Sequence, residues 1–426
     1  MSASRTRLRR LAAVTMAVVA CALSLQAIEP AAANTSGNAI APVDSLARGL
    51  TDRRAATVTA PTDIAFTPDG RGLITTDAGQ LRVLRPSGLV PGAAVDLSAR
   101  ICDGGERGLL GVAVDPDFAD NRWIYLFWTF DKNSFCGVAS AQTPVNRVTR
   151  YRLRANDQVA GGSARAIVDN IPSPATNHNA GDLDFGADGM LYITTGDGGC
   201  EIGAPTDCGA ANGNSLRLDI PLGKVLRVTP TGEVPADNPF VDAVDARRCT
   251  APGGPDPGTG PCTETYAHGF RNPFRMDIRP GTSTPWVNDV GQDAWEEIDK
   301  VEPGADYGWN IREGFCLTGS LVSCEPSSYT DPLFAYDHDS NCRSITGGAF
   351  VPPATWGGRF AGDYVFADFV CGSIWRLHRA ADMSYNAKPL APAAGPVALT
   401  FGPSRQGRAL YYAEYFSGQI RRITQS

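Results

Sequence analysis

The chain reads Ile64-Ala65-Phe66-Thr67-Pro68-Asp69-Gly70 at its first alternating strand and turn, and five similar segments follow. Each is an apolar strand that ends in a turn containing Pro or Gly, and the later copies lie at 112–118, 183–189, 276–281, 348–352 and 398–403. Most copies continue into a second apolar run and many into a third strand. Six copies of strand, turn, strand, loop and strand predict an all-β fold, a six-bladed β-propeller.

Several intervals between copies are longer than a bare blade of about 40 to 50 residues. We therefore expect insertions, at about 129–147, 197–219, 235–265 and 313–342. Long loops on a rigid scaffold are common binding regions. The alternative architectures are an open β-sandwich or two unrelated β domains, although no linker divides the chain.

The N-terminal region has the order of a secretory signal peptide: a basic start, an apolar stretch over 11–27, and small residues at 31–33. We predict a signal peptide at 1–33 and a secreted protein. Residues 34–60 are expected to be a loose lead-in that supplies a strand to close the ring, and 61–426 the propeller.

Two alternatives concern this N-terminal region. A retained membrane helix is disfavoured because Ser24 and Gln26 interrupt the apolar stretch, and we expect no membrane span. Lipidation at Cys21 is disfavoured because the apolar stretch continues beyond it.

Cysteines beyond residue 33 occur in neighbouring pairs, which indicates disulfides in an exported chain. They stand at 102, 136, 200, 208, 249, 262, 316, 324, 342 and 371. Sequence alone does not determine their connectivity, but we expect sequential pairing that staples the insertions. A zinc site is disfavoured, because no Cys-x-x-Cys pair occurs and the four histidines are scattered.

The net charge is −7 and no block of basic residues occurs. Nucleic acid is therefore not an expected partner, since phosphate binding needs clustered Lys and Arg. A neutral small molecule is a better candidate substrate.

Polar residues precede several innermost strands, where a propeller brings them to one end of its axis. Glu106, His178 and Arg271 are therefore expected to meet. Imidazole has an unperturbed pKa of about 6.5, so His178 can take a hydroxyl proton near neutral pH. Oxidation of an alcohol also needs a redox cofactor, because no side chain accepts hydride. Arg271 and Asn272 are placed to polarise the oxygen of that acceptor.

The same residues have structural interpretations. His178 can be a turn histidine, and Arg271 can bind carbonyls that close the blade. Glu296 and Glu297 can pin a loop or bind metal. The segment 196–199 is typical of a blade turn, and no EF-hand loop occurs.

Six segments in order resemble the soluble quinoprotein glucose dehydrogenases, or aldose sugar dehydrogenases, and the related Hedgehog-interacting-protein-like proteins. They are 106–118, 177–181, 222–228, 269–273, 289–298 and 306–309, within a match from about Pro61 to Ile423. The resemblance implies pyrroloquinoline quinone (PQQ) on the propeller axis and Ca²⁺ bridging it to backbone carbonyls.

The resemblance also implies roles for particular residues. His178 matches the catalytic base, and Arg271 with Asn272 matches the pair that contacts the quinone. Gly291 and Gln292 match the backbone Ca²⁺ ligands, which suit a cation that prefers oxygen. Glu106 stands where the glucose enzymes carry Gln, and an ionised carboxylate cannot donate a hydrogen bond.

The sequence departs from the family where cationic residues bind the cofactor's carboxylates. Val370, Gly395 and Val397 stand near those positions, and none carries a charge. Charge-assisted hydrogen bonds are the strong ones, so their loss would weaken binding of a tricarboxylate. Arg343 precedes the fifth inner strand and is a candidate substitute.

The sequence thus predicts a secreted, PQQ- and Ca²⁺-dependent dehydrogenase. It would oxidise an aldose or related sugar to the lactone or acid and pass electrons to an external acceptor. One alternative is a non-catalytic propeller that binds a glycan or a protein. Another is a Ca²⁺-dependent sugar lactonase, in which a metal-bound water attacks the substrate.

Overall fold

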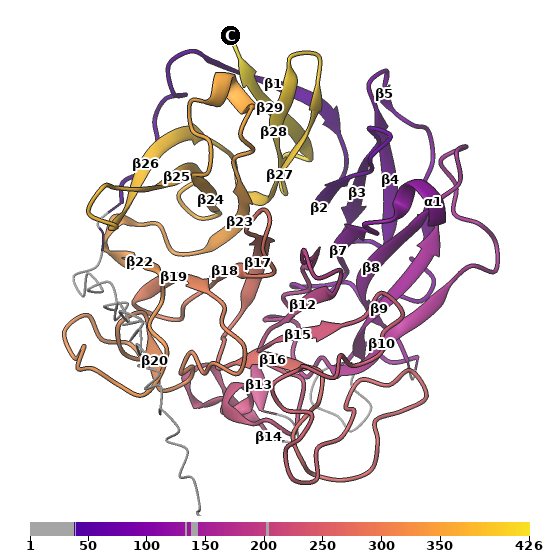
Figure 1. Cartoon of the computed structure of the whole chain (residues 1–426), viewed down its shortest axis with the longest axis vertical. Coiled ribbons are helices and arrows are strands. Elements are labelled where there is room, and N and C mark those ends of the chain that lie inside the picture. Colours follow the sequence, from indigo (N-terminus) through magenta and orange to yellow (C-terminus); the bar gives the residue numbers. More distant parts are fainter. Residues whose placement is uncertain (1–37, 39, 133, 138–143, 202–203) are drawn as a thin grey trace, which may run out of the picture. The chain divides into compact units, whose positions relative to one another are not determined.

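The structure is a computed structural model that describes residues 38, 40–132, 134–137, 144–201 and 204–426. They belong to one unit, Ala33–Ser426, in which six sheets surround a central axis (Figure 1). The predicted six-bladed β-propeller is therefore confirmed. The predicted signal peptide at 1–33, with the lipidation alternative at Cys21, lies outside the described residues.

The first three blades follow one another along the chain. Blade 1 contains β2 (Pro61–Phe66), β3 (Gly72–Thr76), β4 (Gln80–Arg85), β5 (Gly88–Leu89) and β6 (Val95–Asp96). Blade 2 contains β7 (Leu109–Val114), β8 (Trp123–Phe130), β9 (Val145–Arg152) and β10 (Arg165–Pro172). Blade 3 contains β11 (Leu183–Phe185), β12 (Leu191–Thr195), β15 (Lys224–Val228) and β16 (Thr265–His268).

The remaining blades complete the ring. Blade 4 contains β17 (Pro273–Ile278), β18 (Pro285–Asp289), β19 (Trp295–Lys300) and β22 (Phe334–Asp337). Blade 5 contains β23 (Ile345–Phe350), β24 (Tyr364–Asp368), β25 (Ser373–Arg379) and β26 (Tyr385–Pro392). Blade 6 contains β27 (Pro396–Ser404), β28 (Gly407–Glu414), β29 (Gln419–Gln425) and β1 (Leu50–Thr57).

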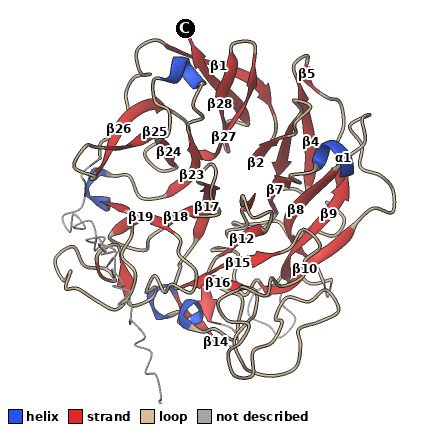
Figure 2. Ribbon diagram, in the orientation of Figure 1, coloured by secondary structure: helices blue, strands red, loops and turns tan. Residues whose placement is uncertain are grey.

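Helices are short and lie between strands (Figure 2). They are α1 (Phe118–Asn121) and the 3₁₀ turns η1 (Gly209–Ala211), η2 (Asn214–Leu216), η3 (His338–Ser340) and η4 (Thr355–Gly358). Two further hairpins lie in the insertions, formed by β13 (Cys200–Glu201) with β14 (Ala204–Cys208) and by β20 (Arg312–Glu313) with β21 (Cys316–Leu317).

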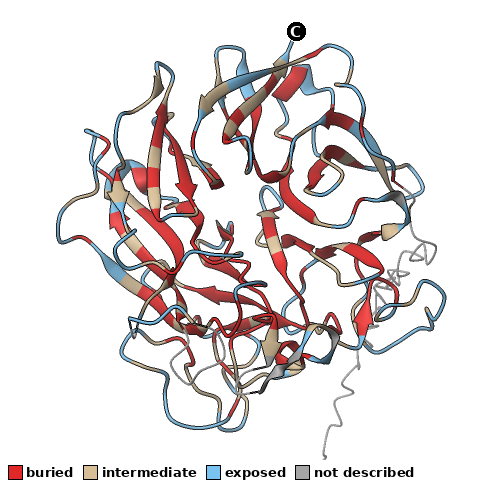
Figure 3. Cartoon of the chain, turned by 180° about the vertical axis from the view of Figure 1, so that it is seen from behind, coloured by how far each residue is buried: buried red, intermediate tan, exposed pale blue. Residues whose placement is uncertain are grey.

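The middle strands are buried on both faces because each blade packs between two neighbours (Figure 3). Every residue of β3, β12, β15 and β24 is buried. Apolar residues therefore predominate in β3, β12 and β24, since a strand covered on both faces needs no polar alternation. β15 is the exception, because it also buries Lys224 and Arg227.

The N-terminal segment closes the ring. β1 pairs antiparallel with β29 as the outermost strand of blade 6, so the first and last strands of the propeller share a sheet. The expectation that the segment before β1 is loose is wrong for Ile40 and Val43, which are buried in the apolar cluster of blades 4 and 5. Apolar burial therefore anchors this segment.

The innermost strands present an unpaired edge to the central channel, and aspartates of neighbouring blades satisfy it. Asp63 on β2 accepts the amide of Val112 on β7 at 2.8 Å. Asp277 on β17 accepts the amide of Phe350 on β23 at 2.6 Å. A buried amide without an acceptor costs free energy, so these carboxylates join the blades around the axis.

Arg275 crosses the channel and separates its two ends. Its guanidinium donates to the carbonyls of Thr62, Leu110, Phe274 and Val397, which belong to four different blades. A cavity of about 710 Å³ lies on the side of the turns that end the innermost strands. A cavity of about 190 Å³ lies on the side where the chain enters them.

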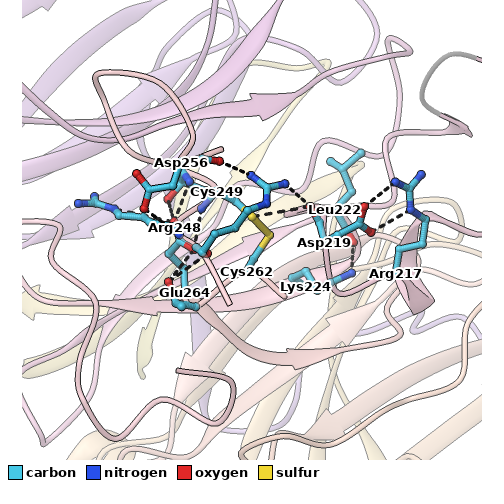
Figure 4. Close-up of a disulfide and its surroundings, with 12 residues drawn as sticks. Arg217, Asp219, Leu222, Lys224, Arg248, Cys249, Asp256, Cys262 and Glu264 are labelled. Carbon is cyan, nitrogen blue, oxygen red and sulfur yellow. Dashed lines mark hydrogen bonds and ion pairs between the residues drawn. A yellow bond between two sulfur atoms is a disulfide. The ribbon is translucent and has the colours of Figure 1, made fainter. Parts of the chain in front are cut away.

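Five disulfides join the cysteines sequentially, as predicted. Figure 4 shows one of them, Cys249–Cys262, in the insertion of blade 3. The buried carboxylate of Glu264 accepts the amides of Cys249 at 3.1 Å and Thr250 at 2.7 Å. The crosslink and this carboxylate hold a long insertion that has little core of its own. Within the described residues, no helix is long and apolar enough to cross a membrane.

Candidate functional site

Three predicted site residues meet at the entry end of the axis. The Oε2 atom of Glu106 accepts the backbone amide of His178 at 2.8 Å and the Nδ2 of Asn272 at 3.0 Å. These residues lie on the connections into β7, β11 and β17, so neighbouring crossovers bring them together. Arg271, which precedes Asn272, is 9% exposed at the same end.

The loop that carries His178 is anchored by its neighbour Asn179. The side chain of Asn179 accepts from Ser173 Oγ at 2.7 Å and from Asn146 Nδ2 at 3.0 Å. His178 itself adopts a left-handed backbone conformation, with φ of 53°. That conformation is uncommon for a residue with a side chain, and such strain often occurs at functional sites. Gly196 allows the close packing, since a Cβ there would lie 2.1 Å from the carbonyl oxygen of His178.

His178 is paired with a buried carboxylate. Its Nδ1 lies 2.7 Å from Oδ1 of Asp197, which is fully buried. Asp197 also accepts the amide of Gly199 at 2.7 Å and the indole N–H of Trp309 at 2.8 Å. An ionised Asp197 accepts from Nδ1–H, which leaves Nε2 of the neutral imidazole as the proton acceptor.

Arg271 is held in a fixed orientation. Its Nη1 donates to the carbonyl of Val290 at 2.9 Å, and its Nε donates to Oε1 of Gln292 at 3.0 Å. The guanidinium lies over the Trp309 ring, 5.5 Å from its centroid. Behind it, Asp289 accepts the backbone amides of Arg271 at 2.9 Å and Asn272 at 2.6 Å. Burial raises the pKa of the Asp289 carboxyl to about 7, although these two amides oppose the shift.

The turn that contains Gly291 and Gln292 is organised by acidic side chains. Oε1 of Glu313 accepts the four consecutive amides from Gln292 to Trp295, at 2.7 to 3.1 Å. Burial alone would raise the pKa of Glu313, but backbone hydrogen bonds outweigh it and the pKa is lowered. Glu296 accepts the amides of Gly291 and Ile345, at 3.4 and 2.9 Å. No amide or side chain of the described residues donates to the carbonyls of Gly291 and Gln292.

Glu296 and Glu297 act as loop anchors. Besides its two amides, Glu296 lies 2.8 Å from Nε2 of His338. Glu297 accepts the amide of Gly314 at 2.5 Å. Both contacts agree with the loop-pinning interpretation of these carboxylates.

Arg343 lies at the edge of the site and is exposed. Its Nε approaches the carbonyl of His338 at 3.4 Å, and it precedes Ser344, which lines the 190 Å³ cavity. No contact joins it to Glu106, His178 or Arg271 among the interactions of the described residues.

The cavity wall beyond Glu106 is aromatic and acidic. Phe369, Val397 and Tyr415 line it together with Asp77. The hydroxyl of Tyr415 donates to Asp77 at 3.0 Å. Burial raises the pKa of Asp77, in spite of that hydrogen bond. Arg275 is the one cation among the described residues that line the cavity, and carbonyls occupy its donors.

Two members of the site were not predicted from the sequence. Asp197 was interpreted as part of a blade turn, and Trp309 only as part of a motif. Asp197 follows β12, the second strand of its blade, and His178 precedes β11, the first strand, so both residues lie at the same end of the blade. That shared position is the signal in the sequence that could have identified Asp197. Trp309 comes from the insertion after β19, so only the fold places it here.

The chain is similar to several known proteins in sequence and in fold. The glucose/sorbosone dehydrogenase family model matches residues 58–391. The chain belongs to this family. Its relatives include the Arabidopsis thaliana HIPL1 protein, 28% identical over 337 residues, with 66% of this chain and 45% of the relative covered. The Escherichia coli aldose sugar dehydrogenase YliI is 30% identical over 255 residues, covering 59% of each chain.

The chain spans about half the length of these curated relatives. Among solved structures, the PQQ-bound form of an aldose sugar dehydrogenase from Streptomyces coelicolor superposes with a TM-score of 0.65 at 21% identity. That match covers 89% of this chain and 99% of the other. It supports the propeller fold of this chain.

Proposed function

We propose that this protein is an exported, quinone-dependent dehydrogenase that oxidises an aldose or related sugar to the lactone or acid. The observation that carries the proposal is the His178–Asp197 pair beside Arg271 and Asn272. Five disulfides support an oxidising, extracellular location.

The chain's own residues supply the proton transfer. Asp197 orients the imidazole through Nδ1 and stabilises the positive charge that develops on it. Nε2 of His178 then accepts the proton of the sugar hydroxyl at the carbon to be oxidised. Arg271 and Asn272 stabilise negative charge that develops on an acceptor oxygen, because their orientation is fixed before reaction.

The donor set fits the reacting end of PQQ, which when bound would accept the hydride. Arg271 and Asn272 are buried at the axis, 9% and 2% exposed, and the N–H groups of their side chains are donors of the kind that a quinone oxygen accepts. The carbonyls of Gly291 and Gln292 form a pair of oxygen ligands suited to Ca²⁺. The cofactor's carboxylates would face a wall with no available cation, so Arg343 is our candidate partner for them.

The missing cations favour one alternative function. Glu106 and Asp77 present acceptors, and Phe369 and Val397 present apolar surface, where a tricarboxylate would need positive charge. A propeller that binds a neutral glycan without turnover would explain why this wall carries acceptors and apolar groups and has no available cation. It leaves the buried His178–Asp197 pair without a role.

Reconstitution with PQQ and Ca²⁺, followed by dye-linked oxidation of a panel of aldoses, tests the proposal. We expect turnover that requires both additions and passes electrons to the external dye. His178→Gln should lower kcat by about 10²- to 10⁴-fold, the usual contribution of general base catalysis.

The matched control is Met383→Ala, an exposed apolar residue in the turn between β25 and β26, at the opposite end of the axis. It should leave turnover unchanged. Equal activity of the wild-type and His178→Gln proteins would reject the assigned base, and no turnover of any aldose would favour the glycan-binding alternative.

A further inference from the structure

A groove lined by arginines lies between blades 6 and 1, which are neighbours in the ring (Figure 1). It consists of two cavities, of about 290 and 490 Å³, that share Ser404, Arg405 and Arg422. Arg405 lies in the turn between β27 and β28, where the innermost strand of blade 6 ends. The groove is therefore at the opposite end of the axis from His178.

Positive charge is concentrated in this groove, and none of its described lining residues is acidic. The arginines that line the two cavities are Arg53, Arg54, Arg85, Arg405 and Arg422. Asp157 neutralises Arg85 from outside the groove, with a contact of 2.8 Å. The side chains of the other four arginines make no ion pair or hydrogen bond within the described residues. Four unpaired cations in a chain of net charge −7 indicate a site for an anion.

Two of these arginines lie opposite each other on adjacent strands. Arg53 on β1 pairs in register with Arg422 on β29. Side chains that are directly opposite in an antiparallel pair project from the same face of the sheet, and like charges there repel each other. The pair weakens the sheet that closes the ring. A bound anion would remove this repulsion.

The spacing of the arginines favours a particular kind of anion. A guanidinium binds phosphate or carboxylate oxygens through two parallel N–H donors. Adjacent strands are about 4.8 Å apart, so Arg53 and Arg422 need negative charges that are closely spaced along the ligand. Directly linked phosphates have such spacing, whereas the carboxylates of an acidic sugar polymer are a whole sugar ring apart. The 490 Å³ cavity has room for more than one phosphate group.

The groove lacks features that other polyanions require. Single-stranded nucleic acid stacks its bases on exposed aromatic rings. Phe66 and Tyr411 are the aromatic residues among the described lining residues, and their rings pack against each other with centroids 4.7 Å apart. Tyr411 is only 4% exposed, so little ring surface is available for a base. A lipid bilayer is flat and would contact arginines on a projecting face, whereas these arginines line a hollow.

We propose that Arg53, Arg54, Arg405 and Arg422 bind an unbranched chain of phosphate groups. Arg53 and Arg422 hold one phosphate from two sides, and Arg405 and Arg54 bind the chain as it continues into the larger cavity. Ser404 lines both cavities, and its Oγ accepts the amide of Gln406 at 3.3 Å, which leaves the hydroxyl hydrogen to donate to a phosphate oxygen. A ligand bound here leaves the opposite end of the axis open. The site does not depend on the proposed function.

Calorimetric titration of the full protein with inorganic polyphosphate tests the groove, with orthophosphate and polygalacturonate as comparison anions. We expect polyphosphate to bind about 10-fold or more tightly than either, at equal concentration of negative charge, and to bind more weakly as salt screens the charges. Arg405→Gln and Arg422→Gln should each weaken this binding about 10-fold.

The matched control is Arg379→Gln, which removes an exposed arginine of blade 5 that has no ion pair within the described residues. It should bind polyphosphate like the wild type. Without ligand, Arg422→Gln should unfold at the wild-type temperature or a higher one, because it removes like-charge repulsion. Polyphosphate should raise the unfolding temperature of the wild type. Dye-linked oxidation of aldoses should be the same in Arg422→Gln as in the wild type, so the two proposals stand or fall separately.

Absence of polyphosphate binding, or an equal loss in Arg379→Gln, would overturn the site. Orthophosphate or polygalacturonate affinity equal to that of polyphosphate would overturn the assigned ligand. The same holds if a single-stranded oligonucleotide or phosphatidylglycerol vesicles bind more tightly than polyphosphate.

Discussion

At the scale of single residues, the site depends on contacts between blades. The topology of the repeats predicted that Glu106, His178 and the Arg271–Asn272 pair would meet, and the hydrogen bonds of Glu106 join three of these four residues. Asp197 was missed because a Gly-Asp-Gly-Gly segment is the same in sequence whether it only turns the chain or also orients a histidine. Its role depends on the approach of another loop, which local sequence does not encode.

Replacement of Asp197 tests its role as the positioning residue of the base. In Asp197→Asn, the amide group cannot accept from His178, Gly199 and Trp309 in the way that the carboxylate does, so the tautomer of His178 is no longer fixed. By comparison with other carboxylate–histidine pairs, we expect kcat to fall about 10²- to 10⁴-fold with a smaller change in KM. Steady-state kinetics measure both.

Trp309→Phe removes one hydrogen bond to Asp197 and leaves the carboxylate, so its effect on kcat should be smaller. A purely structural Asp197 predicts instead that both variants lose stability and that the folded fraction keeps its kcat. Kinetics normalised to the folded fraction separate the two cases.

Lys224 provides a test of pH dependence. Its ammonium is fully buried and donates to the carbonyls of Asn214, Ser215 and Leu222. Burial lowers its pKa to about 7 from the usual 10.5. Between these values the unfolded chain binds more protons on this group than the folded protein does, so this group makes the free energy of unfolding rise with pH.

Urea unfolding at pH 7, 8 and 9 measures this contribution. Lys224→Met should be less stable at every pH, because three carbonyls lose their donor, and should show a smaller rise in stability with pH than the wild type. Parallel pH profiles of the two proteins would show that Lys224 stays protonated when buried.

At the scale of elements, the alternating strands and their turns were predictable because they repeat. The sequential disulfides were predictable for the same reason, since each pair falls within an insertion or between neighbouring loops. The aspartates of the inner strands were not singled out. Their partners are amides on the next blade, as with Asp63 and Val112, and a sequence does not show which strand edge stays unpaired.

Asp63→Ala tests the contribution of these bonds between blades. It leaves the buried amides of Ile64 and Val112 without their acceptor. The free energy of unfolding should fall by about 1 to 3 kcal/mol, the cost of an unpaired buried polar group. Chemical denaturation followed by fluorescence measures it.

The comparison variant is Asp242→Ala, since Asp242 is exposed in the insertion of blade 3. It should change stability by less than about 0.5 kcal/mol. Similar losses from both substitutions would mean that net charge, and not the bond between blades, accounts for the effect.

At the scale of the whole molecule, ring closure and one axial arginine hold the blades together. β1 pairs with β29, and Arg275 binds carbonyls of four blades in the channel. The sequence analysis suggested the closing strand but gave no indication of Arg275, which lies inside the fourth repeat and is only 4% exposed. Its four acceptors lie on four different blades, so only the closed ring brings them together around Arg275.

Arg275→Met tests the axial contacts. The substitution retains much of the side-chain volume but leaves four carbonyls without their donor, so the free energy of unfolding should fall by about 3 kcal/mol or more. Arg279→Met is the control, because the Arg279 side chain packs over Trp286 and makes no hydrogen bond within the described residues. Equal stability of the two variants would show that the blades need no axial connection.

We propose that the entry end of the axis would bind a quinone, with His178, Arg271 and Asn272 as the residues around its reacting end. Calorimetric titration of the full protein with PQQ, with and without Ca²⁺, tests it most directly. We expect saturable, Ca²⁺-dependent binding that Arg271→Met weakens and Met383→Ala does not. Absence of binding at high micromolar PQQ in the presence of Ca²⁺ would contradict it and favour the glycan-binding alternative.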